Sequence, residues 1–220
     1  MALMHSTTLV PSKLELLAAW LPTQPWFTGD SSRLQSLGSY RLDDPAGDVG
    51  MEGHLLTAGD DRVYHVPLSY RAAPLSDEVE GGEAFGVGTS EHGVLGTRWF
   101  SDAIGDPVFR ATLAATIARG GHEAAEFVAQ PDGTATPRDL HTRVRGSGHP
   151  DAEVPDLSDA TVETGSTVSR ASTPTAILEL LRVLDPTGAP GEALDPQAQV
   201  LSVHWERSEW PAVGAILRAV

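Results

Sequence analysis

"MEGHLLTAGDDRVYHVPLSY", residues 51–70, has the clearest hairpin pattern in the chain. Segments 51–57 and 62–70 carry β-branched and aromatic residues, and the connection "AGDD" between them has turn composition. We therefore predict two antiparallel strands. Pro67 favours a sheet edge or a strand end for the second strand, because proline cannot donate a ladder hydrogen bond. The side chains of that strand expected in the core are Tyr64, Val66, Leu68 and Tyr70.

A short helix is predicted upstream of the hairpin. Ser12 followed by Glu15 fits a capping box at its start. Apolar residues recur at helical spacing from Leu14 to Trp20, and Pro22 stops the pattern.

Glycine and acidic residues predict irregular connections on both sides of the hairpin. Residues 41–50 have turn composition, and residues 76–93 contain too much glycine for a regular element. A strand is expected next, over residues 94–102.

The strongest helix signal follows this strand. Asp106 is a suitable N-cap, Pro107 suits the first turn, and the pair Gly120 and Gly121 ends the apolar helical pattern. We therefore predict a second helix between these residues.

From residue 122 onward the chain is predicted to form short strands separated by acidic, proline- and glycine-rich connections. Segments 146–158 and 185–197 are expected to be the most flexible, and residues 210–220 fit either a strand or a short helix. The fold class is α+β with a mainly antiparallel sheet and few helices. We divide the chain into region 8–120 and a β-rich region 121–220, packed together as one globular unit.

Composition excludes several classes of function. The 220 residues carry a formal charge of −15 and no cysteine, so disulfides, thiolate metal sites and a cysteine nucleophile are excluded. Such an acidic chain repels a phosphate backbone, and we expect no nucleic-acid partner. No apolar run reaches the roughly 20 residues of a membrane span and no secretory signal is evident, so we expect a cytoplasmic protein.

Three segments share an order and spacing of motifs: "KLELLAAWLPTQPWFTG" (13–29), "RVYHVPLSYRAAPL" (62–75) and "EHGVLGTRWFSDAIGDPVFRATLAATI" (91–117). Together they resemble the N-terminal cap region of actinobacterial maltokinases and the stand-alone proteins similar to that cap. A weaker resemblance continues through residues 176–190, which look like the kinase strand and turn that follow the cap.

The resemblance implies a role in α-glucan metabolism, where maltokinases phosphorylate maltose with ATP and Mg²⁺. The position similar to the kinase strand lysine is Glu179, whose charge would repel nucleotide phosphates. The sole lysine, Lys13, lies at the start of the first predicted helix, and the chain has no H-G-D, H-R-D, D-F-G or D-F-E motif. We therefore expect a cap-like, pseudokinase-like fragment without the catalytic lobe, without kinase activity and without a cofactor.

Three aromatic residues near the end of the first helix have two interpretations. Trp20, Trp26 and Phe27 could stack on sugar rings, or they could anchor the helix end to the sheet. The second interpretation is favoured, because large aromatic side chains mostly serve cores.

Seven polar or aromatic residues gather in two segments that we expect to pair. Arginine forks and carboxylates there could orient an anionic or polyhydroxylic ligand in a pocket. Alternatively, the charged members pair only with one another and hold a loop in place. The seven residues are Tyr70, Arg71, Glu91, His92, Arg98, Trp99 and Asp102.

Metal and nucleotide sites are not predicted. The eight histidines show no H-E-x-x-H or H-x-H spacing, and the glycines fit neither G-x-G-x-x-G nor a P-loop. Our leading hypothesis is a non-catalytic protein that binds a partner enzyme or a carbohydrate-related ligand in α-glucan or trehalose metabolism. The alternative is a protein or enzyme that binds a sugar or sugar phosphate through the seven-residue group above.

Overall fold

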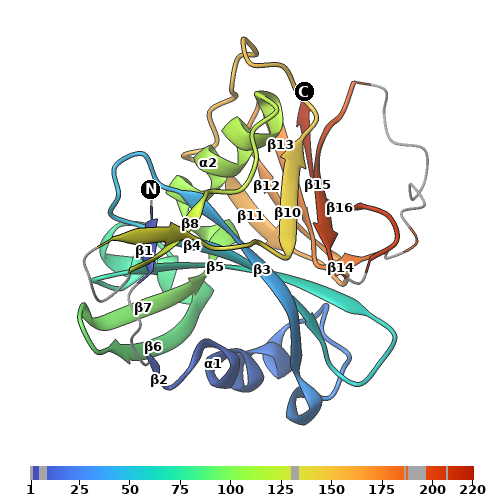
Figure 1. Cartoon of the computed structure of the whole chain (residues 1–220). Helices are drawn as coiled ribbons and strands as arrows, with labels where there is room; N and C mark the ends of the chain where they lie inside the picture. Colours follow the sequence, from blue (N-terminus) through green and yellow to red (C-terminus); the bar gives the residue numbers. More distant parts are fainter. Residues whose placement is uncertain (1, 5–8, 130–133, 186, 188–196, 207) are drawn as a thin grey trace.

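The computed structural model describes residues 2–4, 9–129, 134–185, 187, 197–206 and 208–220. Two large antiparallel sheets and two α-helices account for most of these residues (Figure 1). The fold is therefore α+β with mainly antiparallel sheets, as predicted.

The first helix begins and ends where the sequence indicates. α1 spans Lys13–Trp20, and the side chain of Ser12 accepts the backbone N–H of Glu15 while the Glu15 carboxylate accepts the N–H of Ser12. A 3₁₀ turn, Leu21–Thr23, follows directly. The predicted capping box is confirmed.

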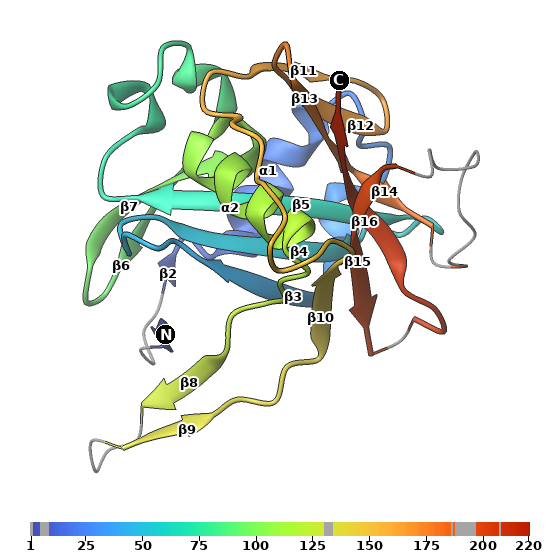
Figure 2. The ribbon, with the colours of Figure 1, turned by 90° about the horizontal axis from the view of Figure 1, so that it is seen from above.

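The first sheet has the strand order β2-β6-β7-β5-β4-β3, and the short strand β14 pairs with the first two residues of β5. α1 packs on one of its faces and α2 lies over the other (Figure 2). The strands are β2 (Leu9–Val10), β3 (Gln35–Asp43), β4 (Gly50–Thr57), β5 (Val63–Arg71), β6 (Gly86–His92), β7 (Gly96–Asp102) and β14 (Val183–Leu184).

The predicted hairpin is confirmed as β4 and β5, but the edge position expected for Pro67 is wrong. β5 lies between β4 and β7, and its residues are buried on both faces from Val63 to Ser69. The N–H of His65 donates to the backbone carbonyl of Arg182. Because N–H direction alternates along a strand, the nitrogen of Pro67, two residues later, points to the same side. On that side β14 pairs with residues 63–64 of β5, and β7 pairs with residues 68–71. Pro67 lies in the gap between these two partners, so its missing N–H costs no ladder hydrogen bond.

Two of the longer strands were not predicted, nor were the short strands β1 (Ala2–Met4) and β2. β3 was missed, and β6 forms within the glycine-rich stretch expected to be irregular. Gly88 has a structural reason to be a glycine, because a Cβ there would lie 2.8 Å from Leu16 Cδ2 of α1. Glycine thus permits the helix to approach β6 closely.

The second helix, α2, spans Pro107–Ala118 and fits its prediction. Asp106 caps it by accepting the N–H of Val108, and Gly120 adopts φ 66° just beyond its end. α2 packs against β3 and against the second sheet, so its buried side chains fill the space between the two sheets.

The second sheet has the order β10-β15-β16-β13-β12-β11. Residues 212–219 form a strand, which decides between the two alternatives for that segment, whereas most of segment 185–197 lies outside the described residues. The strands are β10 (Thr142–Gly146), β11 (Thr161–Thr164), β12 (Val168–Ser172), β13 (Ala176–Leu181), β15 (Gln199–Trp205) and β16 (Ala212–Ala219). A small third sheet contains β1 (Ala2–Met4), β8 (Glu126–Ala129) and β9 (Ala135–Pro137).

Buried polar groups join the first sheet to the second half of the chain. Arg182 donates to Asp102 over 2.5 Å and to Ser169 over 2.8 Å, with its guanidinium 5.1 Å from the ring centre of Trp26. His65 contacts the carbonyl of Leu181 at 3.1 Å. No helix within the described ranges has the length and hydropathy required to cross a membrane.

Candidate functional site

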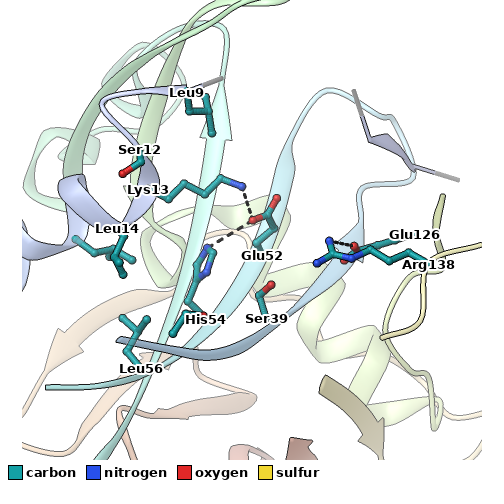
Figure 3. A pocket seen from close by; sticks show the side chains of 12 residues that line it. Leu9, Ser12, Lys13, Leu14, Ser39, Glu52, His54, Leu56, Glu126 and Arg138 are labelled. Carbon is teal, nitrogen blue, oxygen red and sulfur yellow. Dashed lines mark hydrogen bonds and ion pairs between the residues drawn. The ribbon is translucent and has the colours of Figure 1, made fainter. Parts of the chain in front are cut away.

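A buried carboxylate on β4 forms the centre of the candidate site. Glu52 and His54 are two residues apart in a strand, so they point to the same face, toward α1. Lys13, in the first turn of α1, places Nζ 2.5 Å from Glu52 Oε2 and 5.2 Å from the ring centre of Tyr70. His54 Nε2 lies 3.5 Å from the same carboxylate oxygen (Figure 3).

Two further side chains reach Glu52 from neighbouring strands. Arg41 on β3 donates to the hydroxyl of Tyr70 over 2.9 Å, and this hydroxyl donates to Glu52 Oε1 over 3.1 Å. We call these five residues the Glu52 cluster: Lys13, Arg41, Glu52, His54 and Tyr70.

The surroundings fix the protonation states in this cluster. Burial alone would raise the pKa of Glu52, but the adjacent Lys13, His54 and Arg41 outweigh it and lower this pKa to about 2. Burial lowers the pKa of His54 to about 4, although the neighbouring carboxylate opposes this shift. At neutral pH the cluster therefore presents an ionised carboxylate beside a neutral imidazole.

A pocket of about 410 Å³ opens onto the Glu52 cluster (Figure 3). Its volume lies within the usual range for small-molecule sites. Serine hydroxyls and leucine side chains surround the charged groups, and the ion pair between Glu126 and Arg138, at 3.0 Å, forms the opposite wall. The lining residues are Leu9, Ser12, Lys13, Leu14, Leu17, Ser36, Ser39, Glu52, His54, Leu56, Glu126 and Arg138.

His54 has hydrogen-bonding capacity that the fold does not use. Its Nε2 is buried and has no hydrogen-bond partner within the described part of the chain. A neutral imidazole carries one donor and one acceptor, and an ionised carboxylate accepts several hydrogen bonds. The pocket thus borders an unsatisfied imidazole nitrogen together with serine hydroxyls and leucine side chains, a combination that can orient a polyhydroxylated ligand.

The aromatic residues proposed for sugar stacking serve mainly as core. Trp26 is fully buried and Trp20 is 9% exposed, and their ring centres are 5.9 Å apart in an edge-on arrangement. Phe27 is partly buried with its ring centre 4.9 Å from that of Tyr64. Both tryptophans are buried and contact each other, as in the anchoring interpretation, and sugar stacking by the three aromatic residues stays a prediction.

The seven-residue group is dispersed instead of converging on one pocket. Tyr70 belongs to the Glu52 cluster, whereas Arg71 makes two hydrogen bonds of 2.9 and 2.8 Å to Asp106, the cap of α2. Asp102 is buried in its pair with Arg182. These arginine and carboxylate groups therefore hold the structure together, as in the alternative interpretation, but with partners other than those expected.

The remaining members lie along the β6–β7 hairpin. Glu91 accepts the hydroxyl of Thr97 over 2.6 Å, and His92 Nδ1 accepts backbone N–H groups in the hairpin turn. Arg98 donates to the carbonyl of Thr97, and Trp99 is 39% exposed. Ligand binding by these four residues stays a prediction.

Sequence reasoning missed four members of the Glu52 cluster: Lys13, Arg41, Glu52 and His54. A usable signal was present for two of them. Glu52 and His54 pair across the hairpin with Leu68 and Val66, which were predicted to face the core. Cross-strand partners point to the same face of a sheet. Charged or titratable residues that pair with residues of a predicted buried face are therefore candidates for a functional site.

The structure also places Glu179, for which the sequence resemblance predicted the position of a kinase lysine. Its carboxylate accepts hydrogen bonds from Arg170 at 2.6 Å and lies 2.8 Å from Arg218, so both neighbouring strands supply a cation. Within the described ranges, no three His, Asp or Glu side chains converge in a geometry that could hold a metal ion.

Comparison with known families gives the site a context. Residues 20–106 match the maltokinase N-terminal cap domain. Over this range the chain is similar to that domain, which supports the cap-like assignment. The matched range includes β3–β7 and thus Glu52 and His54, whereas Lys13 belongs to α1, which begins before the matched range. No curated protein sequence matches the chain.

Proposed function

We propose that the chain is a non-catalytic protein of α-glucan or trehalose metabolism whose cap domain binds a carbohydrate-related ligand. The metabolic context comes from the match to the cap domain. A family match by itself does not identify a ligand, so the binding proposal needs its own observation. The observation that carries the binding proposal is the pocket over the Glu52 cluster, with the buried Nε2 of His54 left without a hydrogen-bond partner in the described structure.

The chemistry of the pocket supports a saccharide. Glu52 remains ionised at neutral pH and keeps lone pairs beyond those used by Lys13 and Tyr70, so it can accept ligand hydroxyl groups. Ser36 and Ser39 add groups that both donate and accept. Leu14 and Leu56 offer apolar contact to the C–H groups of a sugar ring.

Binding can be tested by thermal denaturation with glucose, maltose and trehalose. A ligand present at 100 times its Kd stabilises a protein by about 2.7 kcal/mol, which is measurable as a higher Tm. We expect Leu14→Trp to abolish this increase, because Leu14 lies at the rim, 38% exposed, and a larger side chain would fill the pocket. Its matched control is Leu95→Trp, an exposed position on the β6–β7 hairpin that should leave binding intact.

No stabilisation by any of the three sugars, confirmed by calorimetric titration at millimolar concentration, would contradict the proposal. An equal Tm increase in wild type and Leu14→Trp would place binding elsewhere on the protein.

A partner enzyme of the same metabolism is the second candidate. The observation that favours it is the apolar tip of the β6–β7 hairpin, where Val94 is 63% and Leu95 is 47% exposed. Retention of purified α-glucan enzymes on immobilised protein tests this candidate. The double variant Val94→Ser/Leu95→Ser should lose retention, and unchanged retention would exclude the hairpin tip.

A further inference from the structure

We infer that Glu52 acts as a charge filter that makes the pocket select uncharged polyhydroxylated ligands over phosphorylated ones. This inference deepens the proposed function and depends on it for the location of the ligand. It assigns a specificity-determining role to Glu52 and narrows the ligand from sugars in general to neutral sugars.

The first observation is that the charges lining the pocket cancel in pairs. Lys13 is paired with Glu52 at 2.5 Å, and Arg138 with Glu126 at 3.0 Å. These four are the charged side chains among the lining residues that the structure describes, because His54 is neutral at pH 7. Each cation that an anionic ligand would meet in the pocket therefore already has a carboxylate partner.

The second observation is that the charge on Glu52 is permanent under physiological conditions. Its side chain is 15% exposed and is held ionised by Lys13 and Arg41. Arg41 Nη1 lies 3.8 Å from Glu52 Oε1, and Arg41 is also shared with Asp43, at 3.7 Å, and with the hydroxyl of Tyr70. A phosphate beside Glu52 would be repelled by a charge that bulk water screens little.

Neutral ligands escape this repulsion and use the same carboxylate as an acceptor. A sugar hydroxyl can donate to Glu52 while the imidazole of His54 makes a second hydrogen bond. The residue that excludes phosphate is thus the residue that receives the neutral ligand, so one substitution should change both affinities in opposite directions.

Calorimetric titration with glucose, maltose and glucose 1-phosphate tests the inference. For the wild type we expect glucose or maltose to bind at least about tenfold more tightly than glucose 1-phosphate, because one like charge at close range in a partly buried site costs roughly this factor. Glu52→Gln retains the shape but frees Lys13. We expect it to bind glucose 1-phosphate about tenfold more tightly than the wild type does, and neutral sugars more weakly.

Two further variants separate this effect from a structural one. Glu126→Gln removes the carboxylate that pairs with Arg138 on the opposite wall. It should also improve phosphate binding, but less, because the Arg138 side chain is 47% exposed and better screened. Glu83→Gln removes an exposed carboxylate of the cap domain away from the pocket and should change neither affinity. High salt should reduce the gain in Glu52→Gln.

The outcomes distinguish the inference from the proposed function. If the wild type binds glucose 1-phosphate as tightly as glucose, the charge filter is overturned and carbohydrate binding stands. If the wild type binds neither while Glu52→Gln binds glucose 1-phosphate, the filter is supported and the neutral ligand is refuted. If no variant binds any of these compounds, both are overturned.

Discussion

Replacing Arg182 by methionine should destabilise the protein more than most single substitutions. Arg182 is fully buried and pairs with Asp102, whose side chain is only 5% exposed. It also donates to Ser169 and lies over the ring of Trp26, so it connects the second sheet to both the β7 strand and the aromatic core. Methionine fills much of the volume but leaves the Asp102 carboxylate buried without its cation.

The expected cost follows from this burial. Removing one partner of a buried ion pair destabilises a protein by about 3–5 kcal/mol, because the remaining charge loses compensation but stays out of water. For a chain of this size, each kcal/mol lowers Tm by roughly 2–4 °C, so Arg182→Met should melt about 10 °C below the wild type.

Urea denaturation followed by tryptophan fluorescence and circular dichroism measures this difference. The control is Arg62→Met, an exposed arginine, for which a change within about 0.5 kcal/mol is expected. The double variant Asp102→Leu/Arg182→Met removes both charges and should regain most of the lost stability. A loss below about 1 kcal/mol in Arg182→Met, or a double variant as unstable as the sum of its single variants, would refute the assigned role of the pair.

The other predictions concern pH, packing and capping. Burial lowers the pKa of His65 to about 3 and that of His54 to about 4, so both stay neutral in the fold while their unfolded counterparts gain protons below pH 6.5. Each should cost about 2 kcal/mol of stability between pH 7 and pH 5, and urea denaturation of His65→Asn at both pH values should show about half of the wild-type pH effect. Gly53→Ala should cost about 2–3 kcal/mol in thermal denaturation, since its Cβ would overlap the ring of Tyr40; an unchanged Tm would contradict this packing. Ser12→Ala should lose about 1 kcal/mol by removing the cap of α1, whereas Ser12→Asp should stay near the wild type.

Local chemistry made the helices predictable. Ser12 with Glu15, and Asp106 with Pro107, satisfy backbone groups within one turn, so the residues that define each helix start are adjacent in the sequence. The β4–β5 hairpin was predictable for a similar reason, because its turn composition and its alternation are both local.

Tertiary contacts decided what the sequence pattern did not predict. β5 is buried on both faces because α1 covers one side and the second half of the chain covers the other, and alternation in a single strand cannot reveal the second cover. β6 tolerates its glycines because β7 and α1 pack closely against it. Propensity is only a weak guide where packing decides.

The candidate site was least predictable because long-range pairing assembles it. Lys13 and Glu52 are 39 positions apart, and their separate neighbourhoods look like a helix start and an ordinary strand. Arg71 and Asp102 appeared in the sequence to be neighbours in a pocket, but each found a more distant partner, Asp106 and Arg182 respectively. Charged residues can thus be identified as important before their partners are known.

The solitary lysine has a practical consequence for handling this protein. Reagents that acylate primary amines find only Lys13 and the α-amino group, and Lys13 lines the pocket with its side chain 24% exposed. Attachment to a biosensor chip by amine coupling would therefore tether a share of the molecules through the ligand cavity itself. A fluorescent dye attached to Lys13 would respond to a ligand that enters the pocket.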